Sequence, residues 1–489
     1  MKLVSKEELS KTPQVAVSLS GTLEREHLSL AKVTLLGLAG LQLAPSISVI
    51  GAILIIYSGN GAWLSLLIAL TSALCLSAAV NVFARRYVVT GSLMSYVGFA
   101  LGNRARRLTA ASYLVGYVVA VAAGIAAIVV FTSSFLVSVG FDFGAGGVVQ
   151  SATAVVVAFA AGGLAYRGLD TSIRVTAFLF LLCLPFVAVV IVAAAWKGGI
   201  SLVPQFRLQD TTPAGVIGGA VVAMSAFVGF DGLATLAAET KEPKRTVPRL
   251  ILLVLGIVGV VYIVAALVQV GPLSAELDQI TAGVSPTAVM AAIGGVSFLQ
   301  KPTDLLLAGA TFAGLVALMN YGSRIIATAA ADGLLPRRAA RIHPRFHSPT
   351  GATIILTVAA TAVLVLLQVV ASASPLESST YLYILFSYYW VLPYVLIAIG
   401  AIVILVREGR RNVLVPGVIV VGAATFVVLF VYGIANSSGG VLGALPYVAI
   451  GTTVLLFGVL SFADRGRASD ELPGDVDGDR RSELSLADD

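Results

Sequence analysis

The hydrophobic and polar positions of this chain separate into long apolar runs joined by short polar connections. Twelve runs reach about the 20 residues with which an α-helix crosses the roughly 30 Å hydrocarbon core of a bilayer. They do not alternate apolar and polar residues as the strands of a membrane β-barrel do. The pattern predicts an all-α polytopic membrane protein with twelve transmembrane helices. We expect these helices at residues 35–57, 62–83, 108–138, 149–165, 175–195, 214–238, 250–270, 304–330, 351–371, 380–405, 413–434 and 444–463.

The composition agrees with residence in a lipid bilayer. Hydrophobic residues make up 58% of the chain and charged residues only 11%, too little polar surface to cover a soluble globule. Residues 1–34 are polar and lack the short apolar core and cleavage site of a signal peptide, so we expect a cytoplasmic N-terminal segment there. Residues 464–489 are polar and mostly acidic, and we expect a disordered cytoplasmic tail.

The basic residues are distributed unequally between the two sides of the predicted bundle. Lys197, Arg207 and Lys301 lie in connections on one side, and the other 28 of the 31 Lys and Arg lie on the opposite side or at its membrane edge. Cytoplasmic loops retain Lys and Arg, so both termini are expected in the cytoplasm and the protein in the plasma membrane. This sidedness accounts for the net charge of +6, and no nucleic-acid partner is expected.

The sequence gives no sign of a metal, a cofactor or an enzyme. Cys75 and Cys183 fall inside predicted spans, where a thiol packs as a small hydrophobic group. No Cys, His and Asp cluster has the spacing of metal ligands, and there is no phosphate-binding glycine-rich loop with its Lys-Ser/Thr pair. We therefore expect no cofactor and no ATP-driven transport.

Two predicted spans have irregular centres, "LAPSIS" at 43–48 and "SAFVGFDG" at 225–232. Proline removes a backbone donor, glycine weakens a helix, and the ionisable Asp231 is costly at membrane depth. Such backbone is tolerated only where it lines a cavity or is buried in protein. The breaks are five spans apart, which predicts two five-helix halves, 35–195 and 214–405, the second inverted, followed by two helices at 413–463. The alternatives are a simple proline kink and serines that bond back to their own helix.

Four segments then give a specific resemblance. They are "TGSLMSYVGFALG" (90–102), "YRGLDTSIRV" (166–175), "SAFVGFDGLATLAAETKEPKRTVPR" (225–249) and "ALMNYGSRIIATAAADGLLPRRAARIHPR" (317–345). In this order, over about residues 30–465, they resemble the amino acid-polyamine-organocation (APC) superfamily. The resemblance implies a LeuT-like 5+5 inverted repeat with broken helices 1 and 6. It also implies a secondary active transporter, or permease, that moves an amino acid or related amine across the lipid bilayer. The first span carries "APSIS" where the family usually has a glycine-rich break.

The resemblance also implies where a substrate would bind. Free amide N–H groups at the positive end of a half-helix would meet the carboxylate of an amino acid, and freed carbonyls would accept from its ammonium. Ser225 and Phe227 would shape the side-chain pocket, although plain packing is an equal alternative for Phe227. The implied binding residues are Ala44, Pro45, Ser46, Ile47, Ser48, Ser225, Ala226, Phe227, Val228 and Gly229.

Two charged residues are implied in coupling or gating. Asp231 matches the acidic residue that follows the helix-six break in the family, where it is a gating or proton-linked group. Its alternative is a helix cap that accepts from backbone N–H groups. Arg324 would pair with an acidic residue such as Asp332 or Glu239 and close the cytoplasmic side.

The coupling ion stays open at this stage. No Lys or Arg lies between Arg174 and Lys197, so the helix-five lysine of proton-coupled relatives is missing, and its place falls at or near Cys183. Span eight offers only Thr311 toward a sodium site. Proton-coupled symport or exchange is the leading hypothesis. Sodium-coupled or uncoupled exchange of a polyamine or other organic cation is the alternative, and a channel or non-transporting scaffold is a more remote one.

Two further segments are expected near the outer side. Tyr388, Tyr389 and Trp390 would line the outer vestibule or simply pack in the core. Residues 272–302 are too interrupted to cross the bilayer and too apolar to be free in water, so we expect them to pack over the outer opening as a lid.

Overall fold

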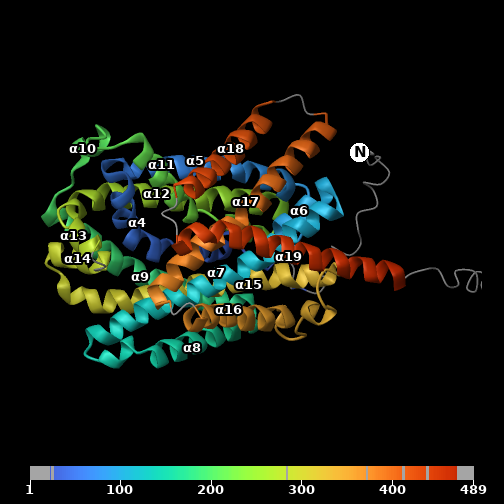
Figure 1. The fold of residues 1–489 in the computed structure, drawn as a ribbon, viewed down its shortest axis with the longest axis horizontal. Helices are drawn as coiled ribbons and strands as arrows, with labels where there is room; N and C mark the ends of the chain where they lie inside the picture. The colour runs from blue at the N-terminus through green and yellow to red at the C-terminus, as the bar shows by residue number, and fades with distance from the viewer. Residues whose placement is uncertain are drawn as a thin grey trace, which may run out of the picture.

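A computed structural model describes residue 23 and residues 27–281, 285–370, 373–409, 413–436 and 440–470. Within these residues the regular structure is helical apart from one isolated parallel β-bridge between Leu28 and Thr240. The helices form an elongated bundle in which α13 and α14 lie at one end and α6 at the other (Figure 1). Eleven helical stretches of the described residues are long and apolar enough to cross a membrane. The all-α polytopic prediction is confirmed.

The helix boundaries follow the predicted spans closely, usually with a few more residues at each end. The α-helices are α3 (Leu30–Gly40), α4 (Leu43–Ser58), α5 (Ala62–Ala84), α6 (Ser92–Leu101), α7 (Asn103–Ser138), α8 (Gly147–Tyr166), α9 (Leu169–Gly198), α10 (Leu202–Phe206), α11 (Pro213–Ser225), α12 (Pro243–Ser274), α13 (Leu277–Thr281), α14 (Pro286–Gly294), α15 (Gln300–Ala331), α16 (Thr350–Val370), α17 (Pro375–Arg407), α18 (Leu414–Ala435) and α19 (Gly440–Asp470). The 3-10 helices are η1 (Gly59–Gly61), η2 (Asp142–Ala145), η3 (Phe230–Glu239), η4 (Ser297–Leu299) and η5 (Arg337–Ala340).

The first of the eleven stretches, Leu30–Ala84, is 55 residues long and holds two of the predicted spans. At about 1.5 Å per residue it exceeds the thickness of one bilayer more than twofold. It contains α3, α4 and α5, and the chain turns at η1, where Gly59 takes a φ of 52°. At the other end of the chain, α19 continues to Asp470. Residues 471–489 of the expected tail, and residues 1–22 and 24–26 of the N-terminal segment, lie outside the described residues.

Helix α7 forms the centre of the bundle together with α15 and α17, which both pack on it. Most of the apolar stretch of α7 and of α15 is buried inside the protein, whereas α8, α18 and α19 bury less than a third of theirs. Large apolar side chains on the peripheral helices point outward, as expected of a surface solvated by lipid. The broken helices described below are held against this centre, since α15 contacts α3, α4 and η3.

The described residues of the segment 272–302 fold mainly as short helices and do not cross the bundle. They form the last turn of α12, then α13, α14 and η4, and the first residues of α15. Helix α14 packs along α9 and also contacts α4, α12 and α15. The segment therefore packs on the bundle at the end where α13 and α14 lie (Figure 1).

Candidate functional site

The first helix break lies between α3 and α4, at Leu41 and Gln42. Gln42 has a φ of 52°, in the left-handed region that side-chain-bearing residues seldom adopt, and its N–H bonds back to the carbonyl of Ala39 at 2.8 Å. The break therefore occupies the two residues directly before "LAPSIS", the stretch that the sequence predicts to be irregular. Residues 43–48 instead form the first turns of α4.

The reason for this shift is the position of Pro45. It is the third residue of α4, in the first turn, where a missing N–H costs no intrahelical hydrogen bond. The next N–H, of Ser46, makes the first regular bond, to the carbonyl of Gln42 at 2.9 Å. Ser48 donates back to the carbonyl of Pro45 at 2.6 Å. Proline thus starts a helix here, and only the N–H groups of Leu43 and Ala44 precede that first bond.

The second break lies where the sequence predicts it. Helix α11 ends at Ser225 and η3 begins at Phe230, and residues 226–229 connect them. Gly229 has a φ of 91°, which favours glycine because a side chain would strain the backbone. The hydroxyl of Ser225 donates to the carbonyl of Val222 at 2.7 Å, so its hydrogen bond stays within α11.

Tyr262 on α12 connects the two breaks. Its hydroxyl donates to the carbonyl of Leu41 at 3.1 Å, and its ring lies 5.7 Å, between centroids, from the ring of Phe227. A second tyrosine, Tyr383 on α17, donates to Oε1 of Gln42 at 2.8 Å. Segments almost 190 positions apart in the sequence are therefore neighbours.

The region beside the second break is closely packed in this structure. Phe227 is almost completely buried, and the adjoining cavity has a volume of about 10 Å³, no more than a single water molecule needs. The cavity is lined by Ala73, Leu76, Met224, Phe227, Val228, Phe230, Tyr394 and Phe426. Of the pocket residues expected at this break, Phe227 and Val228 line it.

The carboxylate of Asp231 is fully buried and accepts three side-chain hydrogen bonds. Trp390 Nε1 donates at 2.9 Å and the Tyr394 hydroxyl at 2.7 Å, both from α17, and the Tyr113 hydroxyl donates from α7. Ser92 donates to the backbone carbonyl of Asp231 at 2.8 Å. These contacts tie the start of η3 to α7 and α17, which a carboxylate that only capped its own helix would not do.

The three donors were missed by sequence reasoning. Trp390 was expected to line a vestibule or to pack, and its ring is fully buried while its N–H binds Asp231. One signal was available, because Trp390 and Tyr394 are four residues apart and so lie on one face of a helix. Tyr389 is also buried, and its hydroxyl lies 2.7 Å from Oγ1 of Thr452.

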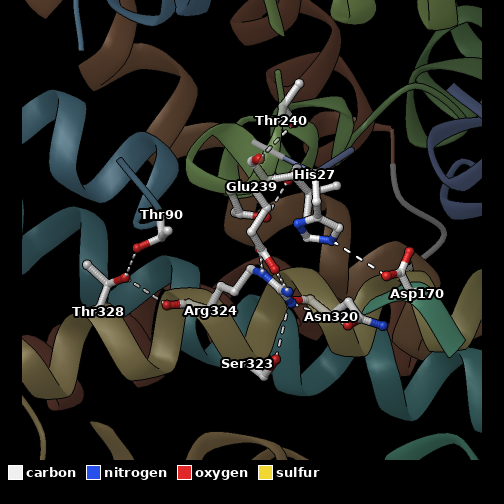
Figure 2. Close-up of polar contacts among 12 residues, drawn as sticks. His27, Thr90, Asp170, Glu239, Thr240, Asn320, Ser323, Arg324 and Thr328 are labelled. Atoms are coloured by element: carbon white, nitrogen blue, oxygen red, sulfur yellow. Dashed lines mark hydrogen bonds and ion pairs between the residues drawn. The ribbon is translucent and has the colours of Figure 1, made fainter. Parts of the chain in front are cut away.

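Arg324 and Glu239 form a buried bidentate ion pair (Figure 2). Arg324 Nε lies 2.6 Å from Glu239 Oε2, and Nη2 lies 2.8 Å from Oε1. Nη1 donates to the backbone carbonyl of Asn320 at 2.9 Å. Of the two expected partners, Glu239 therefore binds Arg324, and Asp332 binds Arg106 on α7 at 2.9 Å.

The N-terminal segment packs against the same end of the bundle. The N–H of Leu28 donates to the carbonyl of Glu239 at 3.0 Å, and the N–H of Lys241 donates to the carbonyl of Leu28 at 3.1 Å. Lys32 Nζ lies 3.1 Å from the carboxylate of Asp170, which His27 also approaches (Figure 2). These contacts join the segment that precedes α3 to η3 and to α9.

Candidate ion ligands in the middle of the bundle are few. Thr311 donates back to the carbonyl of Leu307 at 2.8 Å, within its own helix. Cys183, at or near which the helix-five lysine of proton-coupled relatives is expected, is buried. Among the described residues no group of three or more His, Cys, Asp or Glu side chains is arranged to hold a metal ion.

Comparison with known proteins adds the family. Residues 28–459 match a family model described as amino acid permease. Proteins of Mycobacterium tuberculosis and Mycobacterium bovis, each named an uncharacterized transporter, are 28% identical to this chain over 409 residues. The match covers 83% of this chain and 84% of each relative.

Proposed function

We propose that this chain, which belongs to the amino acid permease family of the APC superfamily, is a secondary active transporter of an amino acid or related amine. The family and its relatives make it a transporter and not an enzyme. Transport would occur by alternating access, with protons coupled in symport or exchange. The observation that carries the proposal is the contact of the two helix breaks through Tyr262, which donates to Leu41 and packs on Phe227.

The membrane arrangement that we propose has twelve spans in the plasma membrane. The broken helices α3–α4 and α11–η3 are spans one and six, α5 is span two, and the remaining candidate helices follow in order. Spans one to five and six to ten would form two inverted halves, with α18 and α19 outside the repeat. Because each half has five spans, the second half would be inverted relative to the first. The even total would put both termini on one side, and the Lys and Arg residues, most of which lie on that side, make it the cytoplasmic one.

The substrate carboxylate would bind at the start of α4. The N–H groups of Leu43 and Ala44 precede the first regular bond of that helix, and the helix dipole favours negative charge there. Pro45, Ser46, Ile47 and Ser48 would keep this turn in place rather than bind through unwound backbone.

The substrate ammonium would bind at the second break. The last carbonyls of a helix have no intrahelical partner. The carbonyls of Ala226, Phe227 and Val228 come directly after the end of α11 and lie outside both α11 and η3. Phe227 would cover the substrate, Ser225 would shape the pocket, and Gly229 would permit the turn. Since the cavity beside this break is very small, a substrate would need the packed arrangement to open.

Asp231 is the group that we propose for proton coupling. As an anion it accepts from Tyr113, Trp390 and Tyr394, and these bonds hold η3 against α7 and α17. Protonation would remove the charge that strengthens all three bonds. The second break could then separate from α17 and let the site change the side to which it opens.

Arg324 would act as a cytoplasmic gate through Glu239. The pair joins α15 to the end of η3, next to the β-bridge of Leu28 and Thr240. If this end faces the cytoplasm, opening toward the cytoplasm must separate these contacts. The arrangement seen here would be closed on that side.

A binding screen of the purified protein tests the substrate class. An α-amino acid that fits both breaks should raise the apparent Tm. A ligand concentration of about 100 times Kd should stabilise the folded state by about 2.7 kcal/mol. Its methyl ester, which lacks the carboxylate, and its decarboxylated amine should raise Tm much less. Stabilisation by polyamines alone would favour the organic-cation alternative. If no compound stabilises the protein and flux does not saturate with solute, a channel or scaffold is the better account.

A further inference from the structure

A second buried carboxylate lies at the opposite end of α15 from Arg324. Asp304 is 1% exposed, and the 20 residues that separate it from Arg324 span about 30 Å of helix. It lies where α14 and the end of α7 meet α15, in the part of the bundle that holds the proposed outer lid. The proposed function makes no use of it.

Among the described residues, the hydrogen-bond partners of the Asp304 carboxylate are two hydroxyl groups. Ser134 Oγ on α7 lies 3.4 Å from Oδ2, and Thr287 Oγ1 on α14 lies 3.4 Å from Oδ1. Thr287 in turn lies 2.8 Å from Oγ of Ser285, the N-cap position of α14. A hydroxyl that donates to an ionised carboxylate approaches to about 2.5–2.7 Å. Contacts at 3.4 Å therefore offset little of the cost of burying a negative charge.

No described cation compensates this charge at close range. Lys301 on α15 and Lys197 at the end of α9 are exposed, and neither lies within 4.0 Å of the Asp304 carboxylate. Helix α14 and the half of α7 that carries Ser134 hold no charged side chain. Asp142 in η2, which packs against α7, is exposed and negative. A carboxylate buried in this way is unstable unless it takes up a positive charge.

We propose that Asp304 is a proton-binding site and that its protonated side chain holds α14 against α7 and α15. We call this protonated contact the latch. A proton from the outer solution forms an O–H bond with one carboxylate oxygen and neutralises the side chain. The acid then donates to the hydroxyl of Thr287 or Ser134 and accepts from the other, which joins three helices without a buried charge. When the proton leaves, the anion gains hydration only if α14 moves away.

The latch connects external pH to the lid. Helix α14 covers α9 and contacts α4, the half-helix that begins at the first break. Release of α14 would expose the outer side of that half-helix. This site is separate from Asp231, and its test does not depend on which substrate is carried.

Labelling of introduced cysteines measures the position of α14. Cys75 and Cys183 are first replaced by alanine, and then Ala291, buried in α14, or its exposed neighbour Ala292 is replaced by cysteine. The ratio of the two labelling rates with an impermeant thiol reagent removes the intrinsic effect of pH on thiol reactivity. The ratio for Ala291→Cys over Ala292→Cys should rise with pH between about 5 and about 8, by at most about tenfold per unit, the limit for one linked proton.

Two variants distinguish the latch from a general pH effect. Asp304→Asn mimics the neutral acid, so its ratio should stay low at every pH, and Thr287→Val, which keeps the shape but not the hydroxyl, should be labelled readily even at low pH. The matched control Asp142→Asn should follow the unmodified protein. The proposal fails if the unmodified ratio does not change with pH, if Asp304→Asn retains the pH dependence, or if sodium at constant pH replaces the effect of the proton.

Discussion

Arg324 on α15 and Glu239 at the end of η3 bind each other through two hydrogen bonds while their side chains are only 2% and 3% exposed. The attraction between two buried charges offsets the cost of removing them from water only when their geometry is good and their remaining polar atoms are hydrogen-bonded. Here Asn320 accepts the third guanidinium contact. The pair therefore joins the second broken helix firmly to the centre of the bundle.

Replacing Glu239 by glutamine should destabilise the protein strongly, because Arg324 would remain buried without its anion. Loss of one partner of a buried pair costs about 3–5 kcal/mol. Thermal unfolding of the purified protein checks this. The matched control is Glu242→Gln: Glu242 and Arg245 are 3.7 Å apart and mostly exposed, and the change should cost below about 1 kcal/mol. Equal effects of the two substitutions would mean that the buried pair is not structurally important.

Tyr262→Phe should weaken substrate binding, because it frees the carbonyl of Leu41 while it keeps the ring that packs on Phe227. A buried carbonyl left without its donor costs about 1–3 kcal/mol, and the first break should become less well ordered. Ligand affinity and Tm are measured on the same preparation. Tyr388→Phe is the control, since Tyr388 packs edge-on against Phe430 and is only partly buried. If both variants bind ligand as the unmodified protein does, Tyr262 does not organise the site.

Much of the fold was predictable because length and apolarity alone define a membrane span. The predicted spans match the helices to within a few residues, and "SAFVGFDG" marks the second break because Gly229 supplies a backbone angle that other residues avoid. The first break was misplaced. The sequence predicts the interruption at Pro45, whereas the first turn of a helix accepts proline without loss. Gln42, which actually adopts the left-handed conformation, has no such preference that a sequence would reveal.

The candidate site was predictable only in part. Asp231 stands out because an acid is rare in an apolar span, and Arg324 is implied by the family resemblance of residues 317–345. The donors to Asp231 come from Tyr113, Trp390 and Tyr394, on two other helices, and aromatic residues in a membrane bundle are common. Which of them reaches a carboxylate depends on how α7 and α17 pack, which no local pattern in the sequence specifies.

Stability should fall as pH rises through the titration of Asp332, which follows the last residue of α15. Burial raises the pKa of this carboxyl above its ordinary value, and Arg106 opposes the shift only in part. Between the ordinary pKa and the raised one the folded state binds the extra proton, so the free energy of unfolding decreases with increasing pH and stays lower above the raised pKa. Asp332→Asn should lose this slope in Tm. Arg106→Gln should remove the charge that opposes the rise in the pKa of Asp332, and so widen the pH interval over which Tm falls. An unchanged slope in both variants would exclude Asp332 as its origin.

The proposed topology predicts which loops an external reagent reaches. Cysteines introduced in 140–147 or 197–212 should be labelled on intact cells by an impermeant thiol reagent, and cysteines in 241–249 or 337–347 only after the membrane is opened. The basis is that 28 of the 31 Lys and Arg lie on one predicted side. Labelling of 241–249 from outside would overturn both the orientation and the inverted repeat.

The most direct test of the account is uptake by proteoliposomes under an inward proton gradient, measured for the unmodified protein and for Asp231→Asn. The unmodified protein should accumulate its substrate when the proton gradient is present and should ignore a sodium gradient. Asp231→Asn cannot gain or lose the proton, so it should lose gradient-driven accumulation while it retains substrate binding and exchange of one substrate molecule for another. Full accumulation by Asp231→Asn, or accumulation driven by sodium alone in the unmodified protein, would contradict a coupling role for this carboxylate.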